Sequence, residues 1–421
     1  MTDIIEDLAW RGLIAVSTDL DDLRRSLDAG QVTFYGGFDP TAPSLHIGNL
    51  VLLLTMRRLQ LAGHRPIGLV GGATGLIGDP SGKSAERVLN PPEVVAGWVK
   101  HIGDQVARFL DFEPGPASAL MVSNLDWTEE LSALAYLRDL GKHFPVGQML
   151  SREVVRARLE SGISYTEFSY QILQANDFLE LYRRYGCTLQ LGGRDQWGNL
   201  VSGVDLIRRV MGDTAHALAT PLITRPDGTK YGKSEGGAIW LSPELMSPYA
   251  FHQYWLNRAD AEVPGLLRVF TFRSRAEIED LERELAERPA ARTAQRVLAD
   301  DLTTLVHGAE DTARAKAAAE ALFGQGDLRD LDERTLASAL AEARCAVIEQ
   351  TGATVADLME ASGIVASKSE ARRAIEEGGA YVNNVRVTDV KAIPDAGDLL
   401  HGRFLVLRRG KREVGGIEVR G

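Results

Sequence analysis

Apolar and polar positions near the start of the chain follow a strand–helix–strand pattern. Residues 32–35 form a short apolar run that predicts a buried strand. Apolar residues then recur at helical spacing over residues 50–61, and residues 66–70 predict a second strand. Together these segments predict a βαβ unit with parallel strands and a right-handed crossover.

The loop inside this unit carries candidate chemistry. We expect the first strand to break at Gly36 and Gly37, and His46 and Gly48 then stand just where the helix begins. Ligands of βαβ units bind beyond the carboxyl ends of the strands, beside helix N-termini. Taken alone, the pattern also fits a tight loop with a surface histidine.

Strand and helix signals continue to alternate through the first half of the chain. They predict a Rossmann-like, doubly wound α/β domain over residues 1–246. β signals then fade. Ser274 and Glu277 form a capping box ahead of apolar residues at helical spacing, which indicates an α-helical domain over residues 247–323.

A glycine-rich stretch at residues 324–327 separates the last part of the chain, and we assign residues 324–351 to a linker. Residues 352–421 follow with a short helix, a hairpin centred on Asn383 and a final strand. They predict a small α+β domain.

The composition limits the classes of protein to which this chain can belong. The 421 residues are 44% apolar and 25% charged, which is ordinary for a globular protein. The longest apolar run, residues 50–54, is far too short to span a bilayer, and the N-terminus lacks a signal pattern. Two cysteines without metal-ligand spacing favour a cytoplasmic protein with no structural zinc and no other bound metal.

Charge is unevenly distributed along the chain. The net charge of −11 argues against nucleic-acid binding over the whole surface. From Gly352 onward, however, 11 basic residues face 10 acidic ones, whereas the remainder holds 36 basic and 48 acidic residues. This contrast indicates an appended module with its own ligand.

Two loops are candidates for binding phosphate. Residues 78–84 approach a P-loop, but Ile77 stands where that motif requires its first glycine, so a P-loop NTPase is a weak alternative. The second loop places Lys230 and Lys233 on either side of Gly232. Two mobile ammonium groups suit a pyrophosphate whose charge grows in a transition state, although a solvated surface loop fits the second motif alone.

These motifs together resemble a known family. Residues 46–49 (His-Ile-Gly-Asn) and 230–234 (Lys-Tyr-Gly-Lys-Ser) resemble the HIGH and KMSKS signatures of class I aminoacyl-tRNA synthetases. Four further segments resemble the bacterial tyrosyl-tRNA synthetases: residues 35–41, 71–83, 168–177 and 192–199. The resemblance covers nearly the whole chain.

The resemblance implies activation of L-tyrosine by ATP with Mg²⁺, followed by transfer of tyrosine to tRNA(Tyr). Neither step needs a protein nucleophile or a tightly bound cofactor, because catalysis consists of positioning and charge stabilisation. The family pattern places these residues at the phosphates: Thr41, His46, Lys83, Arg87, Lys230 and Lys233. Asn49 is a further catalytic candidate, whose role that pattern leaves unsettled. It places these in the ATP site: Asp39, Gly48, Gly192, Asp195 and Lys233.

The resemblance also implies a tyrosine pocket that is polar at both ends. Tyr35 and Asp177 would bind the phenolic hydroxyl, and a buried carboxylate such as Asp177 needs a partner. Asp79, Tyr170 and Gln174 would hold the α-ammonium group, with Gln196 near the carboxylate.

The C-terminal part resembles a small RNA-binding domain. Its candidate tRNA contacts are Lys368, Arg372, Arg373, Arg408 and Arg409. The family is homodimeric, and we expect the subunit interface near residues 151–165. Two alternatives stay open: a non-catalytic RNA-binding relative, which the intact His46 and Lys230 oppose, and a tryptophan-activating sibling, whose indole offers no hydroxyl to Tyr35.

Asn49 departs from the family pattern, because it replaces the last histidine of HIGH. An amide can still donate a hydrogen bond to ribose or phosphate oxygen but carries no charge. We therefore expect retained activity with altered tuning, and a lower rate of ATP–pyrophosphate exchange in Asn49→Ala. An unchanged rate would remove Asn49 from the site.

Overall fold

The computed structural model describes residues 3–81, 90–159, 162–224, 238–349, 352–411 and 413–420. The chain divides into two compact units. The first consists of Met1–Ser242 and Ala261–Asp280, and the second of Pro243–Asp260 and Leu281–Gly421. The domain boundaries predicted from the sequence stay a prediction. No helix within the described ranges is long and apolar enough to cross a membrane.

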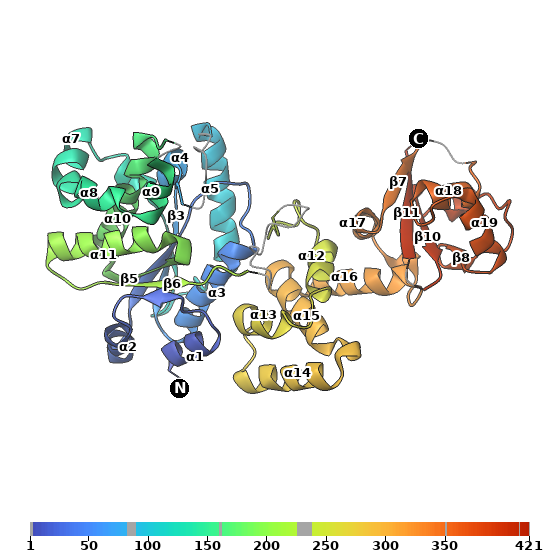
Figure 1. The fold of residues 1–421 in the computed structure, drawn as a ribbon, viewed down its shortest axis with the longest axis horizontal. Coiled ribbons are helices and arrows are strands. Elements are labelled where there is room, and N and C mark those ends of the chain that lie inside the picture. The colour runs from blue at the N-terminus through green and yellow to red at the C-terminus, as the bar shows by residue number, and fades with distance from the viewer. Residues whose placement is uncertain are drawn as a thin grey trace. The chain divides into compact units, whose positions relative to one another are not determined.

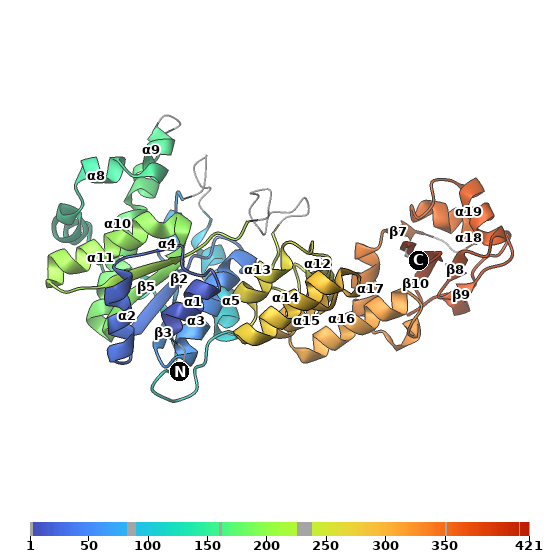
Figure 2. The same cartoon turned by 60° about the horizontal axis from the view of Figure 1, so that its bottom comes forward.

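A six-stranded sheet with the order β1-β6-β5-β2-β3-β4 forms the centre of the first unit (Figures 1 and 2). Its strands are β1 (Val16–Ser17), β2 (Thr33–Phe38), β3 (Arg65–Val70), β4 (Leu120–Ser123), β5 (Cys187–Gly193) and β6 (His216–Thr220). All neighbours pair in parallel except β1 with β6. The strand order reverses between β2 and β5, which is where doubly wound sheets bind ligands. The predicted Rossmann-like fold class is confirmed.

Helices cover both faces of this sheet (Figure 1). On one face lie α3 (Ile47–Leu61) and α5 (Pro92–Ala107); on the other lie α10 (Tyr165–Tyr185) and α11 (Trp197–Met211). The two sides meet adjacent residues of β2: the ring of Tyr35 packs against Phe178 of α10, and Gly36 faces Met56 of α3. The face covered by α10 holds the polar residues described below.

The prediction that β2 breaks at Gly36 and Gly37 is wrong, because the strand continues to Phe38. A Cβ added at Gly36 would lie 2.6 Å from the sulfur of Met56. A larger residue here would displace the side chain of Met56, which packs on the sheet from α3, and the extended backbone passes through Gly36.

The second unit combines helices with a five-stranded sheet. The helices include α12 (Pro248–Leu256), α15 (Thr293–His307), α16 (Ala309–Leu322), α18 (Val355–Ala361) and α19 (Lys368–Glu376). The sheet has the order β7-β11-β10-β8-β9. Its strands are β7 (Cys345–Ile348), β8 (Ala380–Val382), β9 (Val385–Arg386), β10 (Phe404–Arg409) and β11 (Glu413–Val419). The hairpin predicted around Asn383 is confirmed, since Asn383 and Asn384 take positive φ angles of 46° and 64°.

Regular structure fills much of the segment assigned to a linker. Residues 324–351 contain α17 (Glu333–Glu342) and β7, which pairs in parallel with β11. Leu336 and Leu340 of α17 are buried in a core with Phe404 of β10. The glycines at 324 and 326 thus mark a turn, after which the chain returns to the core.

A buried ion pair fixes the start of α10. Arg158, in α9 (Glu153–Leu159), places its guanidinium 2.9 Å from Glu167, and both side chains are almost fully buried. Glu167 lies in the first turn of α10. The pair therefore orients the helix that carries Tyr170, Gln174 and Asp177.

Removing one member of a buried pair deprives the other charge of its charged partner. We expect Glu167→Ala to lower the free energy of unfolding by about 3–5 kcal/mol in urea denaturation. Glu180→Ala is the matched control, because Glu180 lies on the same helix and pairs with Arg183 and Arg184, which are exposed. It should cost less than about 1 kcal/mol. Equal losses would contradict the assignment.

Candidate functional site

One end of the candidate site is an aromatic hydroxyl with no partner among the described residues. Tyr35 is 2% exposed, and its hydroxyl makes no hydrogen bond to any described residue. Its ring centre lies 5.3 Å from that of Phe178. Burial raises the pKa of Tyr35 well above its usual value, and Asp177 and Cys187 raise it further. The hydroxyl is thus a neutral group available to a ligand.

The carboxylate of Asp177 lies at the same end. It is 2% exposed and accepts one hydrogen bond at each oxygen, from the indole N–H of Trp127 at 2.8 Å and from the amide of Asn124 at 3.0 Å. Burial raises its pKa to about 8; these two bonds act in the opposite direction, and the charges of Asp39 and Glu180 raise the value. We call Tyr35 and Asp177 the phenol end.

Asn124 and Trp127 were missed in the sequence analysis. Asn124 directly follows the last residue of β4, and Trp127 lies in the short helix α6 (Leu125–Thr128). A polar residue at the carboxyl end of a parallel strand is a usable signal for a site. Their pairing with Asp177, however, depends on the order of strands in the sheet.

Polar side chains gather again at a second cluster, which we call the ammonium end. The hydroxyl of Tyr170 donates to Asp39 at 2.6 Å, and the side-chain amide of Gln196 donates to Asp79. Burial raises the pKa of Tyr170 well above its usual value, followed by the charges of Asp39 and Asp79. The side-chain oxygen of Gln174 is buried without a hydrogen-bond partner among the described residues.

Helical spacing explains why residues of the phenol end and of the ammonium end lie on one helix, α10. Tyr170, Gln174 and Asp177 follow each other at intervals of four and three residues on α10, so they share the face that meets the sheet. The structure places Asp39, predicted from the family pattern to serve ATP, against Tyr170 of the tyrosine pocket.

His46 forms the N-cap of α3. Its Nδ1 accepts from the backbone N–H of Gly48 at 3.0 Å, so in the neutral ring the proton lies on Nε2. Asn49 completes a capping box, because its side-chain oxygen accepts from the backbone N–H of His46 at 3.1 Å. The amide nitrogen of Asn49 is left to donate. A Cβ at Gly48 would lie 2.8 Å from the ring of His46, so glycine is required there.

Three other predicted residues lie at the carboxyl edge of the sheet. Thr41 is exposed in the loop after β2, and its backbone N–H donates to the carbonyl of Asp39 at 2.9 Å. Gly192 lies in β5, where a Cβ would approach Leu200 to 2.9 Å. Asp195 is exposed in the turn that precedes α11. Lys83, Arg87, Lys230 and Lys233 lie outside the described residues.

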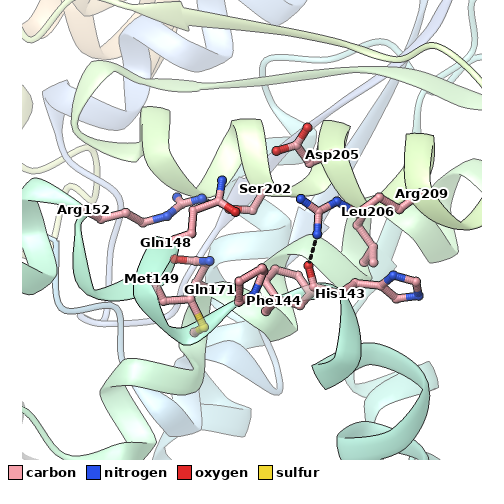
Figure 3. A pocket seen from close by; sticks show the side chains of 11 residues that line it. His143, Phe144, Gln148, Met149, Arg152, Gln171, Ser202, Asp205, Leu206 and Arg209 are labelled. Atoms are coloured by element: carbon pink, nitrogen blue, oxygen red, sulfur yellow. Dashed lines mark hydrogen bonds between the residues drawn. The ribbon is translucent and has the colours of Figure 1, made fainter.

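A separate pocket lies beside α11 and contains none of the predicted site residues (Figure 3). Its volume of about 20 Å³ has room for a water molecule and excludes a nucleotide or an amino acid. Arg152 donates there to the carbonyl of Gly198 and to Ser202, and Arg209 donates to the carbonyl of His143. These bonds fix α11, whose first turn follows Gln196.

The predicted tRNA contacts divide into exposed and buried groups. Arg372 and Arg373 are exposed on α19, and Lys368 forms an exposed ion pair with Asp357 at 2.7 Å. Arg409 pairs with Glu370 at 2.8 Å. Arg408, in contrast, is buried, and its guanidinium stacks on the ring of Tyr381, its neighbour across β8. The structure therefore places Arg408 in the packing of the sheet rather than on the surface.

Comparison with known proteins gives two matching families. A model described as class I tRNA synthetases (W and Y) matches residues 27–324. A second, described as the tyrosine–tRNA ligase SYY-like C-terminal domain, matches residues 336–414.

Individual relatives agree with these matches. The chain is 61% identical to the tyrosine–tRNA ligase of Streptomyces coelicolor over the full length of both proteins. It is 56% identical to that of Mycobacterium tuberculosis, over 99% of this chain and 98% of the relative. A truncated mitochondrial tyrosyl-tRNA synthetase from Aspergillus nidulans superposes with a TM-score of 0.70 at 28% identity, covering 76% of this chain and 94% of that one.

The pKa of Asp177 predicts a pH-dependent stability. The folded protein keeps a proton there up to about pH 8, whereas an unfolded carboxyl releases it near pH ~4. Stability from this group is full below the unfolded pKa and is lost as pH rises through the folded pKa. Relative to Asp177→Asn, wild type should lose stability as pH rises from about 5 to about 8, by at most ~1.4 kcal/mol per pH unit. Thermal unfolding across this range measures it, and a constant difference between the two proteins would contradict it.

Proposed function

Since the chain belongs to the class I tRNA synthetases, within the tyrosine–tRNA ligases, we propose how its own residues carry out that reaction. The protein is a tyrosine–tRNA ligase. A carboxylate oxygen of L-tyrosine attacks the α-phosphorus of ATP, and pyrophosphate leaves. The 3′-terminal ribose hydroxyl of tRNA(Tyr) then attacks the acyl carbon of the adenylate, and AMP leaves.

The phenol end is the observation that supports tyrosine as the amino-acid substrate. The hydroxyl of Tyr35, which has no partner among the described residues, and the carboxyl group of Asp177 form hydrogen bonds with the phenolic hydroxyl of tyrosine. Phenylalanine would leave these buried groups unpaired, which costs free energy. An indole places no oxygen there, which argues against tryptophan.

The ammonium end binds the other part of the amino acid. Asp79 and Tyr170 receive the α-ammonium group, and the buried oxygen of Gln174 gains its missing partner. Gln196, which already contacts Asp79, lies beside the reacting carboxylate. The two ends together hold tyrosine in one orientation for attack on phosphorus.

Helix α3 and the two segments that carry Lys83 and Lys230 stabilise the phosphates of ATP during the reaction. The Nε2–H of His46 donates to a phosphate oxygen at a helix N-terminus, where backbone N–H groups also favour negative charge. Thr41 and the amide of Asn49 add donors. Lys83, Arg87, Lys230 and Lys233 neutralise the departing pyrophosphate, and ATP enters with Mg²⁺ on its phosphates.

The adenosine part of ATP binds along the edge of the sheet. Gly48 and Gly192 let the adenine and ribose approach the backbone closely, and Asp195 accepts from the ribose hydroxyls. Asp39, held by Tyr170, borders both substrates.

The C-terminal module binds tRNA through exposed basic residues. Arg372 and Arg373 on α19, with Lys368 and Arg409, supply phosphate contacts. Support comes from the family match to residues 336–414. Arg408 is buried and packs on Tyr381 within the sheet of this module.

The protein acts as a homodimer in the cytoplasm. Large apolar side chains lie exposed on consecutive segments of the first unit: Leu134, Leu137, Val146, Leu150, Leu159 and Tyr165. A run of exposed apolar side chains of this kind is typical of an interface between subunits. It overlaps the interface region expected around residues 151–165.

ATP–pyrophosphate exchange, measured with each amino acid in turn, tests the proposal. We expect exchange with tyrosine, and at least a hundredfold lower kcat/KM with phenylalanine, from roughly 3 kcal/mol of unpaired buried groups. Charging of tRNA(Tyr) by the same preparation measures the second step. Exchange with tryptophan would overturn the assignment of the phenol end, and exchange with no amino acid would support the non-catalytic alternative.

A further inference from the structure

A single threonine hydroxyl links the phenol end to the ammonium end. Thr74 begins the short helix α4 (Thr74–Ile77) and is 2% exposed. Its hydroxyl donates to Asp39 at 2.6 Å and accepts from the side-chain amide of Asn124 at 2.9 Å. The same amide donates to Asp177 at 3.0 Å. A continuous chain of hydrogen bonds therefore runs from Tyr170 through Asp39, Thr74 and Asn124 to Asp177.

The direction of every bond in this chain is fixed. The side-chain oxygen of Asn124 accepts from the backbone N–H of Ala73 at 2.8 Å, so its two N–H groups face Thr74 and Asp177. A carboxylate accepts and a hydroxyl has one proton, so the proton of Thr74 points to Asp39. No member can rotate without breaking a bond made by another.

The backbone beside this chain of hydrogen bonds is closely packed against it. A Cβ at Gly71 would lie 2.0 Å from the carboxylate of Asp39 and 2.4 Å from the hydroxyl of Thr74. A Cβ at Gly72 would lie 2.7 Å from the hydroxyl of Ser123, the residue before Asn124. The close packing of the segment from Gly71 to Thr74 thus holds Thr74 between Asp39 and the amide of Asn124.

We propose that Thr74 is a positioning residue that couples recognition of the phenolic hydroxyl to recognition of the α-ammonium group. This inference rests on the proposed function of the site. Thr74 acts through Asp39 at one end and, through Asn124, on Asp177 at the other. Loss of its hydroxyl removes one hydrogen bond from Asp39 and one from Asn124, and so weakens the positioning of both carboxylates, because networks of buried hydrogen bonds orient their members jointly.

Two substitutions separate the hydroxyl from the rest of the side chain. Thr74→Val keeps the shape and removes the hydroxyl, and Thr74→Ser keeps the hydroxyl and removes the methyl group. The readouts are KM for tyrosine in ATP–pyrophosphate exchange and inhibition of that exchange by 3-(4-hydroxyphenyl)propionate. This inhibitor has the phenol and the carboxylate but lacks the ammonium group, so contacts to the ammonium group contribute nothing to its binding.

We expect Thr74→Val to raise KM for tyrosine roughly 10- to 100-fold and to weaken the inhibitor roughly 10-fold, as for one lost charge-assisted hydrogen bond. Thr74→Ser should lie within about threefold of wild type. An inhibitor constant unchanged in Thr74→Val would overturn the inference, because Thr74 would then serve Asp39 alone. Failure of Thr74→Ser to restore binding would overturn it too, by assigning the effect to the methyl group.

Thermal unfolding of each variant shows whether it folds. If Thr74→Val does not fold, Thr74→Cys takes its place, because a thiol is a weaker donor of similar size. The result is distinguishable from failure of the proposed function. That failure would show as a wild-type protein without tyrosine-dependent exchange, whereas failure of the inference leaves wild type active and the Thr74→Val inhibitor constant unchanged.

Discussion

The carboxylate of Asp177, buried in the first unit, is the group on which the rest of the site depends. A buried carboxylate is costly unless its oxygens are paired, and here two neutral donors, Trp127 and Asn124, pair one oxygen each. That arrangement fixes the carboxylate in one orientation beside Tyr35 while burial raises its pKa to about 8. Because both donors are neutral, neither offsets the burial with a positive charge, which is why the pKa stays raised.

Short local hydrogen bonds also orient the residues proposed to bind phosphate. The ring of His46 is held by the backbone of Gly48, and the backbone of His46 is held by Asn49. Both contacts lie within four residues at the start of α3, so the helix itself sets the tautomer and direction of the imidazole. The asparagine in place of the last histidine of HIGH has a clear structural role: its oxygen caps the helix and its nitrogen remains a donor.

The sheet brings these local arrangements together. Asp39 follows β2, Thr74 follows β3, Asn124 follows β4, and Asp177 comes from the helix that packs on the same face. The carboxyl ends of parallel strands lie at one edge, so residues far apart in the chain become neighbours there. Two glycines make room for these contacts. Gly36 leaves space for the side chain of Met56 on α3, and Gly71 leaves space for the side chains of Asp39 and Thr74.

The sequence by itself determined the fold class, the βαβ unit at residues 32–70 and the family to which the motifs belong, because periodicity and long motifs are local properties. It also singled out Tyr35, Tyr170 and Asp177 as candidate site residues. It did not show that β2 continues through Gly36, because that depends on Met56 of another element. Nor did it show that Arg408 is buried on Tyr381, or that Asn124, Trp127 and Thr74 belong to the site. These facts follow from strand order and side-chain packing, which bring together residues 20 to 53 positions apart, and only the tertiary structure decides such contacts.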